Sequence, residues 1–385
     1  MKEEFLAYKL NNMSLSEKIG QMIMIDYRSV TEMTVDLEKI LTQYNPGGFI
    51  LFKKSNVVDF EQTKKLLDDI KSATNIRGFM AVDQEGGRVQ RLSENVGFEK
   101  YPPMLEIGET KDPSRAFELG VKMGAELKSI GIDMDMAPVL DIFSNPMNTA
   151  IGDRAFGKTS EDVVNMAFAF SDGLSKEGII PVGKHFPGHG GTLKDSHSKL
   201  PFIDKDLNEL NEFELVPFKE AVNKKLPGIM VGHIAVPQVT GDNMPASLSK
   251  TMINGVLRTD MGYDGLIMTD SLQMKGLKDQ TITNTLESPD KNPPLTDEDI
   301  YIRCVQAGND FILMPKIREV TVQGIKQYIN EAYDTIYRKV NEGLIPESRI
   351  EESVYRILST KFDYGFFDKE YKAFLEFNSS RGRRR

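Results

Sequence analysis

The chain has 385 residues, of which 40% are hydrophobic and 27% charged, a balance that is ordinary for a globular protein with a sizeable core. The formal net charge of −9 argues against a nucleic-acid partner, because phosphate binding needs clustered lysine and arginine. The single cysteine, Cys304, excludes an intrachain disulfide and a thiolate metal cluster.

No stretch approaches 18 consecutive apolar residues, so we expect no membrane-spanning helix. Residues 1–15 are charged and mixed, without the basic start and apolar run of a signal peptide. As the chain stands we expect a cytoplasmic protein. The alternative is an exported or lipid-anchored protein whose signal has been removed.

Short apolar segments recur along the chain, and a longer segment with helical spacing follows most of them. Most are continuous rather than alternating, which is typical of parallel strands covered by helices. The expected strands are residues 21–26, 48–52, 78–82, 132–139, 179–184, 228–232, 265–269 and 309–314. The expected helices are residues 59–73, 113–130, 160–177, 206–225, 249–260 and 297–307. Eight strand–helix units favour an α/β fold of the closed (β/α)8 TIM-barrel type.

An open, doubly wound sheet is the alternative fold, but no G-x-G-x-x-G motif follows the first expected strand. We expect a single domain, with the barrel over about 13–315 and helices over about 318–375 that cover its exterior. The arginine-rich end, 378–385, is expected to be a disordered tail. The polar, proline-containing segment 278–296 is expected to form an extended loop at the barrel mouth.

Polar residues stand where the expected strands end. They are His185, His189 and His197 after the fifth strand, His233 after the sixth, and Asp83, Asp141 and Asp270 after the third, fourth and seventh. Because the carboxyl ends of the strands of a (β/α)8 barrel meet at one mouth, these side chains predict a functional site there.

Asp195 precedes His197 by two residues in a glycine-rich loop. A carboxylate so placed can orient the ring and make it a general acid/base near neutral pH. Considered alone, an ordinary surface loop is the commoner explanation. Asp270 is likewise, on its own, more often a hydrogen-bond anchor than a nucleophile. Together they suit glycoside hydrolysis, in which a carboxylate attacks the anomeric carbon and an acid protonates the leaving oxygen.

Other charged residues at the strand ends could bind sugar hydroxyls through charge-assisted hydrogen bonds. They are Asp83, Arg88 and Arg91 in one loop, Arg154 in the next, and Lys184 with His185. A structural, salt-bridged loop explains the first group equally well, and Lys184 could pair with a carboxylate of the barrel.

A metal site is a further alternative, because His185 and His189 are four residues apart. Pro187 and Gly188 break any helix that would align the two rings, so we expect no metal.

Four segments occur in the order DQEGGRVQR, IGDRAFG, KHFPGHGGTLKDSH and MTDSLQMKG, beginning at residues 83, 151, 184 and 268. This ordered set resembles glycoside hydrolase family 3, over about residues 13–315. More narrowly, it is similar to the single-domain bacterial N-acetyl-β-glucosaminidases of cell-wall recycling. Segment 278–296 departs from that pattern, which leaves the outer subsites open.

The resemblance implies a retaining exo-β-N-acetylglucosaminidase that removes terminal N-acetylglucosamine from peptidoglycan or muropeptide fragments by double displacement, without a cofactor. It implies that Asp270 is the nucleophile, His197 the general acid/base and Asp195 its partner. The implied sugar-binding residues are Asp83, Arg91, Arg154, Lys184 and His185, and we expect His189 and His233 to support loops of the site.

The expected partner is a carbohydrate substrate, bound by a monomer. Open alternatives are a family 3 β-glycosidase with another sugar preference, an N-acetylglucosaminide phosphorylase, and a barrel that binds cell-wall sugars without cleaving them.

Overall fold

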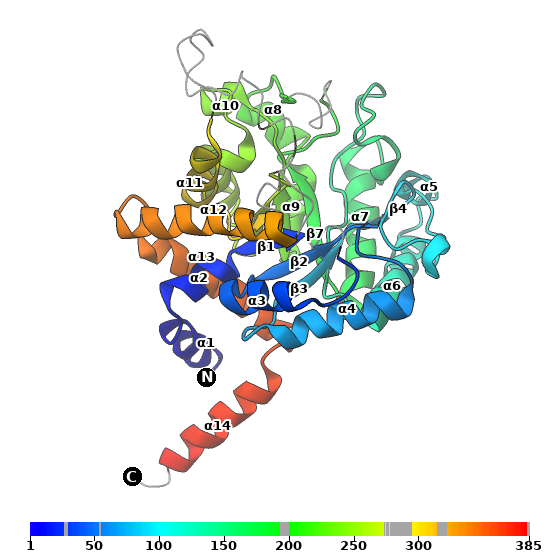
Figure 1. The fold of residues 1–385 in the computed structure, drawn as a ribbon. Helices are drawn as coiled ribbons and strands as arrows, with labels where there is room; N and C mark the ends of the chain where they lie inside the picture. The colour runs from blue at the N-terminus through cyan, green and yellow to red at the C-terminus, as the bar shows by residue number, and fades with distance from the viewer. Residues whose placement is uncertain are drawn as a thin grey trace.

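The computed structural model describes residues 1–26, 30–53, 55–192, 200–272, 274, 277, 295–313 and 322–382. Asp195 and His197 lie outside the described residues, as does the expected mouth loop from 278 to 294. The described residues form a parallel sheet surrounded by helices (Figure 1).

Eight parallel strands form the barrel, and each predicted strand is present. In chain order they are β1 (Ile23–Asp26), β2 (Gly48–Leu51), β3 (Phe79–Val82), β6 (Met134–Asp135), β7 (Ile180–Phe186), β8 (Gly228–Val231), β9 (Leu266–Thr269) and β10 (Ile312–Leu313). Neighbouring strands pair in that order, and β10 also pairs with β1. The barrel closes between β9 and β10 through a parallel bridge of Met268 with Phe311. The predicted (β/α)8 fold is therefore confirmed.

Continuous apolar sequence forms these strands because both of their faces are buried. All four residues of β3 and all four of β8 are inaccessible or nearly so. The strand side chains fill the barrel interior on one side and pack against the helical layer on the other.

The outer helices match the predicted ranges closely where a cap fixes the start. They are α4 (Phe60–Ala73), α6 (Pro113–Ile130), α7 (Ser160–Lys176) and α11 (Asp297–Ala307). Asp112 accepts a hydrogen bond from the Ser114 amide, and Pro113 occupies the first turn of α6. The predicted helix at 249–260 is a π-helix over Thr251–Asp260.

The single helix predicted over 206–225 is wrong, because the structure has two: α8 (Leu207–Glu212) and α9 (Val216–Asn223). Pro217 has no backbone N–H, so it cannot continue α8, but it fits the first turn of a new helix. Helices α1 (Lys2–Asn11), α2 (Leu15–Gln21), α3 (Val35–Tyr44) and α5 (Met104–Glu109) and the short α10 (Pro237–Thr240) were not predicted.

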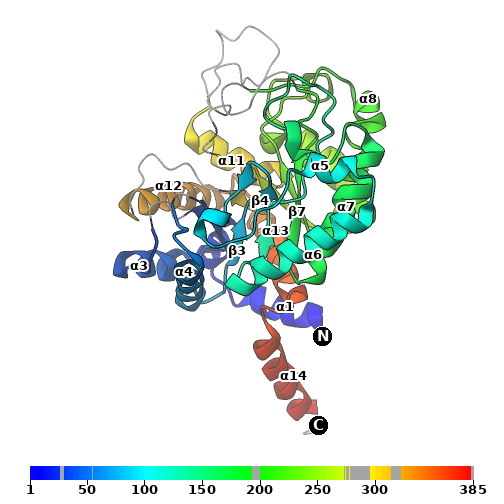
Figure 2. The same cartoon turned by 90° about the vertical axis from the view of Figure 1, so that its right-hand side faces the viewer.

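The C-terminal segment consists of α12 (Val322–Asn341), α13 (Glu347–Asp363) and α14 (Asp368–Gly382). Residues 378–382, expected to belong to a disordered tail, continue α14 instead. Helix α14 extends away from the barrel beside the N-terminal end of the chain (Figures 1 and 2). Its first turns are held by α1, where the Phe5 ring contacts the rings of Tyr371 and Phe374, so the helix is already nucleated before it reaches the polar end.

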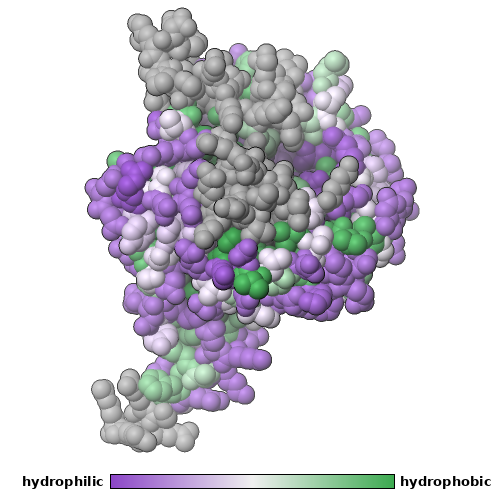
Figure 3. Space-filling model, in the orientation of Figure 1, coloured by the Kyte–Doolittle hydropathy of each residue, from purple (hydrophilic) through white to green (hydrophobic). Residues whose placement is uncertain are grey.

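Much of the surface in Figure 3 is hydrophilic, which fits helices that bury one face and expose the other. Among the described residues, no helix is both long enough and apolar enough to cross a membrane.

Helices α6 and α7 pack along each other on the outside of the barrel (Figure 2). Their close approach depends on glycine. A Cβ atom on Gly120 would lie 2.2 Å from the Phe170 carbonyl oxygen, whereas a Cβ on Gly255, in the π-helix, would meet nothing within 4 Å.

We therefore expect Gly120→Ala to lower the free energy of unfolding by about 1–3 kcal/mol, because the added methyl group forces two backbones apart. The matched control, Gly255→Ala, should leave it unchanged or raise it by up to about 1 kcal/mol. Denaturant unfolding of the two variants measures the difference, and equal effects would contradict this account of the α6–α7 contact.

Candidate active site

The carboxyl ends of the strands carry the predicted polar residues to one end of the barrel. Asp83 follows β3, and the loop after it forms a small hairpin of β4 (Gln84–Gly86) and β5 (Val89–Gln90). Gly86 turns this hairpin at φ +87°, and a Cβ there would lie 2.5 Å from the Pro102 carbonyl oxygen, so both backbone and space require glycine.

Lys184 lies at the centre of the site with its side chain 2% exposed. Its Nζ atom donates to Asp83 Oδ1 at 2.9 Å and to Glu85 Oε1 at 2.5 Å. Arg91 donates to the other oxygen of Asp83, at 3.1 Å, and its guanidinium lies over the Phe52 ring. The hairpin and β7 are thus joined by buried ion pairs.

The charged groups of this network keep one another ionised although they are buried. Burial alone would raise the pKa of Asp83, but Lys184 and Arg91 hold it below its ordinary value. The pKa of Glu85 is likewise lowered to about 2, because Arg154 and Lys184 outweigh its burial. Burial would lower the pKa of Lys184, and the two carboxylates raise it above the ordinary value. Both carboxylates and the ammonium are therefore ionised at neutral pH.

Arg154 forms a bidentate pair with Glu85, with distances of 2.7 Å from Nε to Oε2 and 2.9 Å from Nη2 to Oε1. Its Nη2 also lies 3.4 Å from His185 Nε2. The loop that carries Arg154 is held by Arg88, which donates to the carboxylate of Asp153 and to three carbonyl oxygens of residues 149–151. Arg88 therefore fixes the backbone of the loop that carries Arg154.

Asp141 contacts the ring of His185, in β7, and the backbone of His189, just after β7. His185 Nδ1 lies 2.6 Å from Asp141 Oδ2, and the His189 amide donates to Asp141 Oδ1 at 2.5 Å. Since a carboxylate only accepts, His185 carries its proton on Nδ1 when neutral. Burial lowers the pKa of His189, and its ring Nδ1 lies 2.8 Å from the Thr192 hydroxyl.

Asp270 follows β9 and is half-buried, with its amide donating to the Val231 carbonyl of β8. Its Oδ1 accepts from the Ser271 amide at 2.6 Å. His233, after β8, is buried and contacts Ser247 and the Ser271 carbonyl. The structure thus joins Asp83, Arg91, Lys184, Arg154 and His185 in one hydrogen-bonded network. Asp270 lies at the end of β9, which is separated from β7 by β8.

Two important residues were missed or underused by the sequence analysis. Glu85 is the carboxylate that joins Lys184 to Arg154, and its signal was its place two residues after Asp83 in the same glycine-rich loop. Asp141 was noted at a strand end but was not given its role in orienting His185. Lys184 was also expected to be able to pair with a carboxylate, and it pairs with Asp83 and Glu85. These pairs fix the position of its ammonium group at the mouth.

No group of three or more His, Cys, Asp or Glu side chains among the described residues is arranged to hold a metal ion. His185 and His189 have ring centroids 6.1 Å apart, and their Nδ1 atoms are engaged with Asp141 and Thr192.

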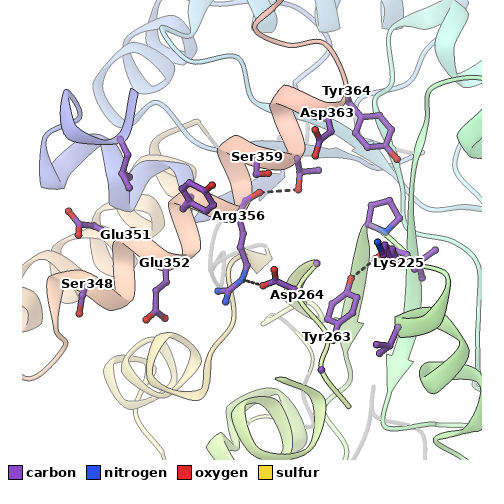
Figure 4. Close-up of a pocket in the computed structure, with 18 residues that line it drawn as sticks. Lys225, Tyr263, Asp264, Ser348, Glu351, Glu352, Arg356, Ser359, Asp363 and Tyr364 are labelled. Carbon is purple, nitrogen blue, oxygen red and sulfur yellow. Dashed lines mark hydrogen bonds and ion pairs between the residues drawn. The ribbon is translucent and has the colours of Figure 1, made fainter. Parts of the chain in front are cut away.

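A groove of about 990 Å³ lies at the other end of the barrel, before β8 and β9 and against α13 (Figure 4). Arg356 crosses it to Asp264 at 3.3 Å, and Tyr263 donates to the Leu226 carbonyl at 2.8 Å. In barrels of this type the amino ends of the strands serve stability, and chemistry occurs at the carboxyl ends. The candidate active site is therefore the Lys184 network and not this groove.

Comparison with known proteins identifies the family to which the chain belongs. The sequence model described as the glycosyl hydrolase family 3 N-terminal domain matches residues 14–360. A β-hexosaminidase of Idiomarina loihiensis is 33% identical, over 85% of this chain and 94% of that protein. A β-hexosaminidase of Methylococcus capsulatus is 39% identical, over 63% and 72%. A family 3 β-N-acetylglucosaminidase structure from Paenibacillus superposes with a TM-score of 0.82 at 32% identity, over 92% of this chain and 63% of that one.

We expect Glu85→Gln to lower the free energy of unfolding by about 3 kcal/mol at neutral pH, because it removes the anion that neutralises two buried cations. Since the pKa of Glu85 is lowered from 4.5 to about 2 on folding, this stabilisation is complete above about pH 5 and is lost as the pH falls towards 2. In denaturant unfolding, the free energies of unfolding of wild type and Glu85→Gln should therefore converge as the pH falls across this range. The control is Glu352→Gln, at a side chain that is 60% exposed. It should change the free energy of unfolding by less than about 0.5 kcal/mol at every pH. A constant difference between wild type and Glu85→Gln would contradict the proposed pairing.

Proposed function

Because the chain belongs to glycoside hydrolase family 3, we propose that it is a retaining exo-β-N-acetylglucosaminidase acting on N-acetylglucosamine-terminated fragments of peptidoglycan. The chain is a glycoside hydrolase of this family, and the relatives named above are β-hexosaminidases. The observation that carries the proposal is the buried Lys184 network at the mouth of a barrel whose β9 is followed by Asp270.

The network suits the recognition of a neutral, hydroxyl-rich sugar. Asp83 has oxygen lone pairs beyond those used by Lys184 and Arg91, and Lys184 has a third N–H beyond the two given to Asp83 and Glu85. A sugar hydroxyl both donates and accepts, so it can bind such a carboxylate–ammonium pair at once. Because the ion pairs fix these groups beforehand, little ordering is needed on binding.

Asp270 would act as the nucleophile in this proposal. Its Oδ1 accepts a hydrogen bond from the Ser271 amide, and its own backbone amide donates to the Val231 carbonyl. In the proposed mechanism the second carboxylate oxygen, Oδ2, attacks the anomeric carbon. His197 would protonate the departing oxygen and later deprotonate water, with Asp195 as its partner. The support for these two roles is the KDSH motif, since both residues lie outside the described part of the chain.

We also propose a single catalytic domain that works as a monomer in the cytoplasm, without metal or organic cofactor. A single family 3 domain model matches residues 14–360, which supports one catalytic domain. The sole, buried cysteine, Cys304, supports a reducing compartment. Among the described side chains no cluster is arranged to hold a metal ion, which supports chemistry without one.

An aryl N-acetyl-β-glucosaminide should be cleaved at least ~10²-fold faster, in kcat/KM, than the matching β-glucoside, because a polar pocket built for a substrate group rejects an analogue that lacks it. Release of the aryl group measures both rates. Equal kcat/KM values would refute the proposed substrate, and a rate that depends on added inorganic phosphate would identify a phosphorylase.

Leaving-group dependence tests the catalytic roles. Asp270→Asn should abolish cleavage of every substrate, because no nucleophile remains. His197→Ala should keep bond cleavage with a good aryl leaving group but lose ~10²–10⁴-fold with a sugar leaving group, since only the basic oxygen needs protonation. On the aryl substrate this variant should show a burst followed by slow turnover, and azide should restore turnover. The cleavage rate of Asp195→Asn with a sugar leaving group should lie between those of wild type and His197→Ala.

An equal loss on both leaving groups, without burst or azide rescue, would make His197 a binding or structural residue. The role of Asp195 as its partner would then be refuted with it.

A further inference from the structure

A chain of hydrogen bonds runs from a buried serine to the turn that carries Asp270. Ser247 lies in a 3-10 turn, Ala246–Leu248, and is fully buried. We propose that Ser247 and His233 are positioning residues for the Asp270 carboxylate, acting through Ser271. The proposal rests on the role of Asp270 in the proposed function and adds two residues to it.

The directions of these hydrogen bonds follow from chemistry. His233 Nε2 lies 2.9 Å from the Ser271 carbonyl oxygen, which can only accept, so Nε2 carries a proton. His233 Nδ1 lies 2.7 Å from the Ser247 hydroxyl. Burial lowers the pKa of His233, so the ring is neutral and Nδ1 is an acceptor. The Ser247 hydroxyl therefore donates to Nδ1 and stabilises the tautomer that Ser271 needs.

Ser271 is thereby held at both ends. Its amide donates to Asp270 Oδ1 at 2.6 Å, and its carbonyl accepts from His233. The backbone amide of Asp270 is held separately, by the Val231 carbonyl at 2.9 Å. A nucleophile must be placed to within a fraction of an ångström, so a residue that fixes the neighbouring peptide controls the rate of attack more than the affinity for sugar.

Ser247 itself is anchored from β10. The side-chain amide of Asn309, buried just before β10, donates to the Ser247 carbonyl at 2.9 Å and to the Cys304 carbonyl at 2.8 Å. The backbone of Ser247 is therefore held in place by a residue that does not belong to the Lys184 network. This arrangement separates the placement of the nucleophile from the placement of the sugar-binding charges.

A matched pair of amides tests which contact matters. In His233→Gln the amide nitrogen reaches about as far as imidazole Nε2 and can donate to Ser271, whereas in His233→Asn it reaches only as far as Nδ1. We expect kcat on an aryl N-acetyl-β-glucosaminide to fall by ~10²-fold in His233→Asn and by less than ~5-fold in His233→Gln, with KM within about 3-fold of wild type in both. A loss in His233→Gln equal to that in His233→Asn, at unchanged thermal midpoint, would overturn the proposal.

Ser247→Ala completes a double-mutant cycle and does not depend on the folding of His233→Asn. In the wild-type background it should lower kcat by about 5- to 10-fold, the worth of one hydrogen bond, at unchanged KM. In the His233→Gln background it should have no further effect, because glutamine has no tautomer to stabilise. Equal losses in the two backgrounds, or none in the wild type, would make Ser247 structural and overturn the proposal.

The same assays separate this inference from the proposed function. A wild-type enzyme without activity on the aryl substrate, or full activity in Asp270→Asn, would refute the proposed function itself. An active wild type and an inactive Asp270→Asn, combined with a failed cycle, would refute only the positioning role of Ser247 and His233.

Discussion

The buried ammonium of Lys184 is the constraint on which the mouth of this barrel depends. An unpaired charge in a protein interior costs several kcal/mol, so the sequence must supply anions at fixed positions around it. Asp83 and Glu85 do so from the hairpin after β3, and Glu85 in turn holds Arg154. The ion pairs of one buried cation therefore connect β7, the hairpin after β3 and, through Glu85, the loop that carries Arg154.

A second, uncharged network serves a different purpose. The Lys184 network is made of ion pairs and presents hydrogen-bonding groups for a sugar, whereas His233 and its neighbours form a neutral relay to the turn after β9. Neutrality matters there, because a fixed positive charge beside Asp270 would stabilise the carboxylate and weaken it as a nucleophile. In the proposed function, the first network binds the sugar and the second positions the nucleophile.

The sequence predicted the eight strands well because parallel strands buried on both faces must be continuously apolar, and few other elements are. It predicted the polar residues of the mouth because strand ends converge in a barrel. It did not reveal that Glu85, in a loop interpreted from its glycines and arginines, is the central anion, since partner choice depends on three-dimensional distance. The helices α1, α2 and α3 were not predicted, and the break before Pro217 was overlooked although proline marks it.

The packing of α1 against α14 has a consequence for how this enzyme can be tethered. Phe5 contacts the rings of Phe362, Phe367, Tyr371 and Phe374, so the N-terminal helix and the last helices meet in one aromatic cluster. Leu10 of α1 lines the groove before β8 and β9, which places this cluster at the end of the barrel opposite the Lys184 network. A surface linker, a fluorescent label or a fused domain joined at either end would therefore be directed away from the mouth. Immobilisation through these helices should therefore leave the mouth of the barrel accessible, and a linker between them offers a route to circular permutants.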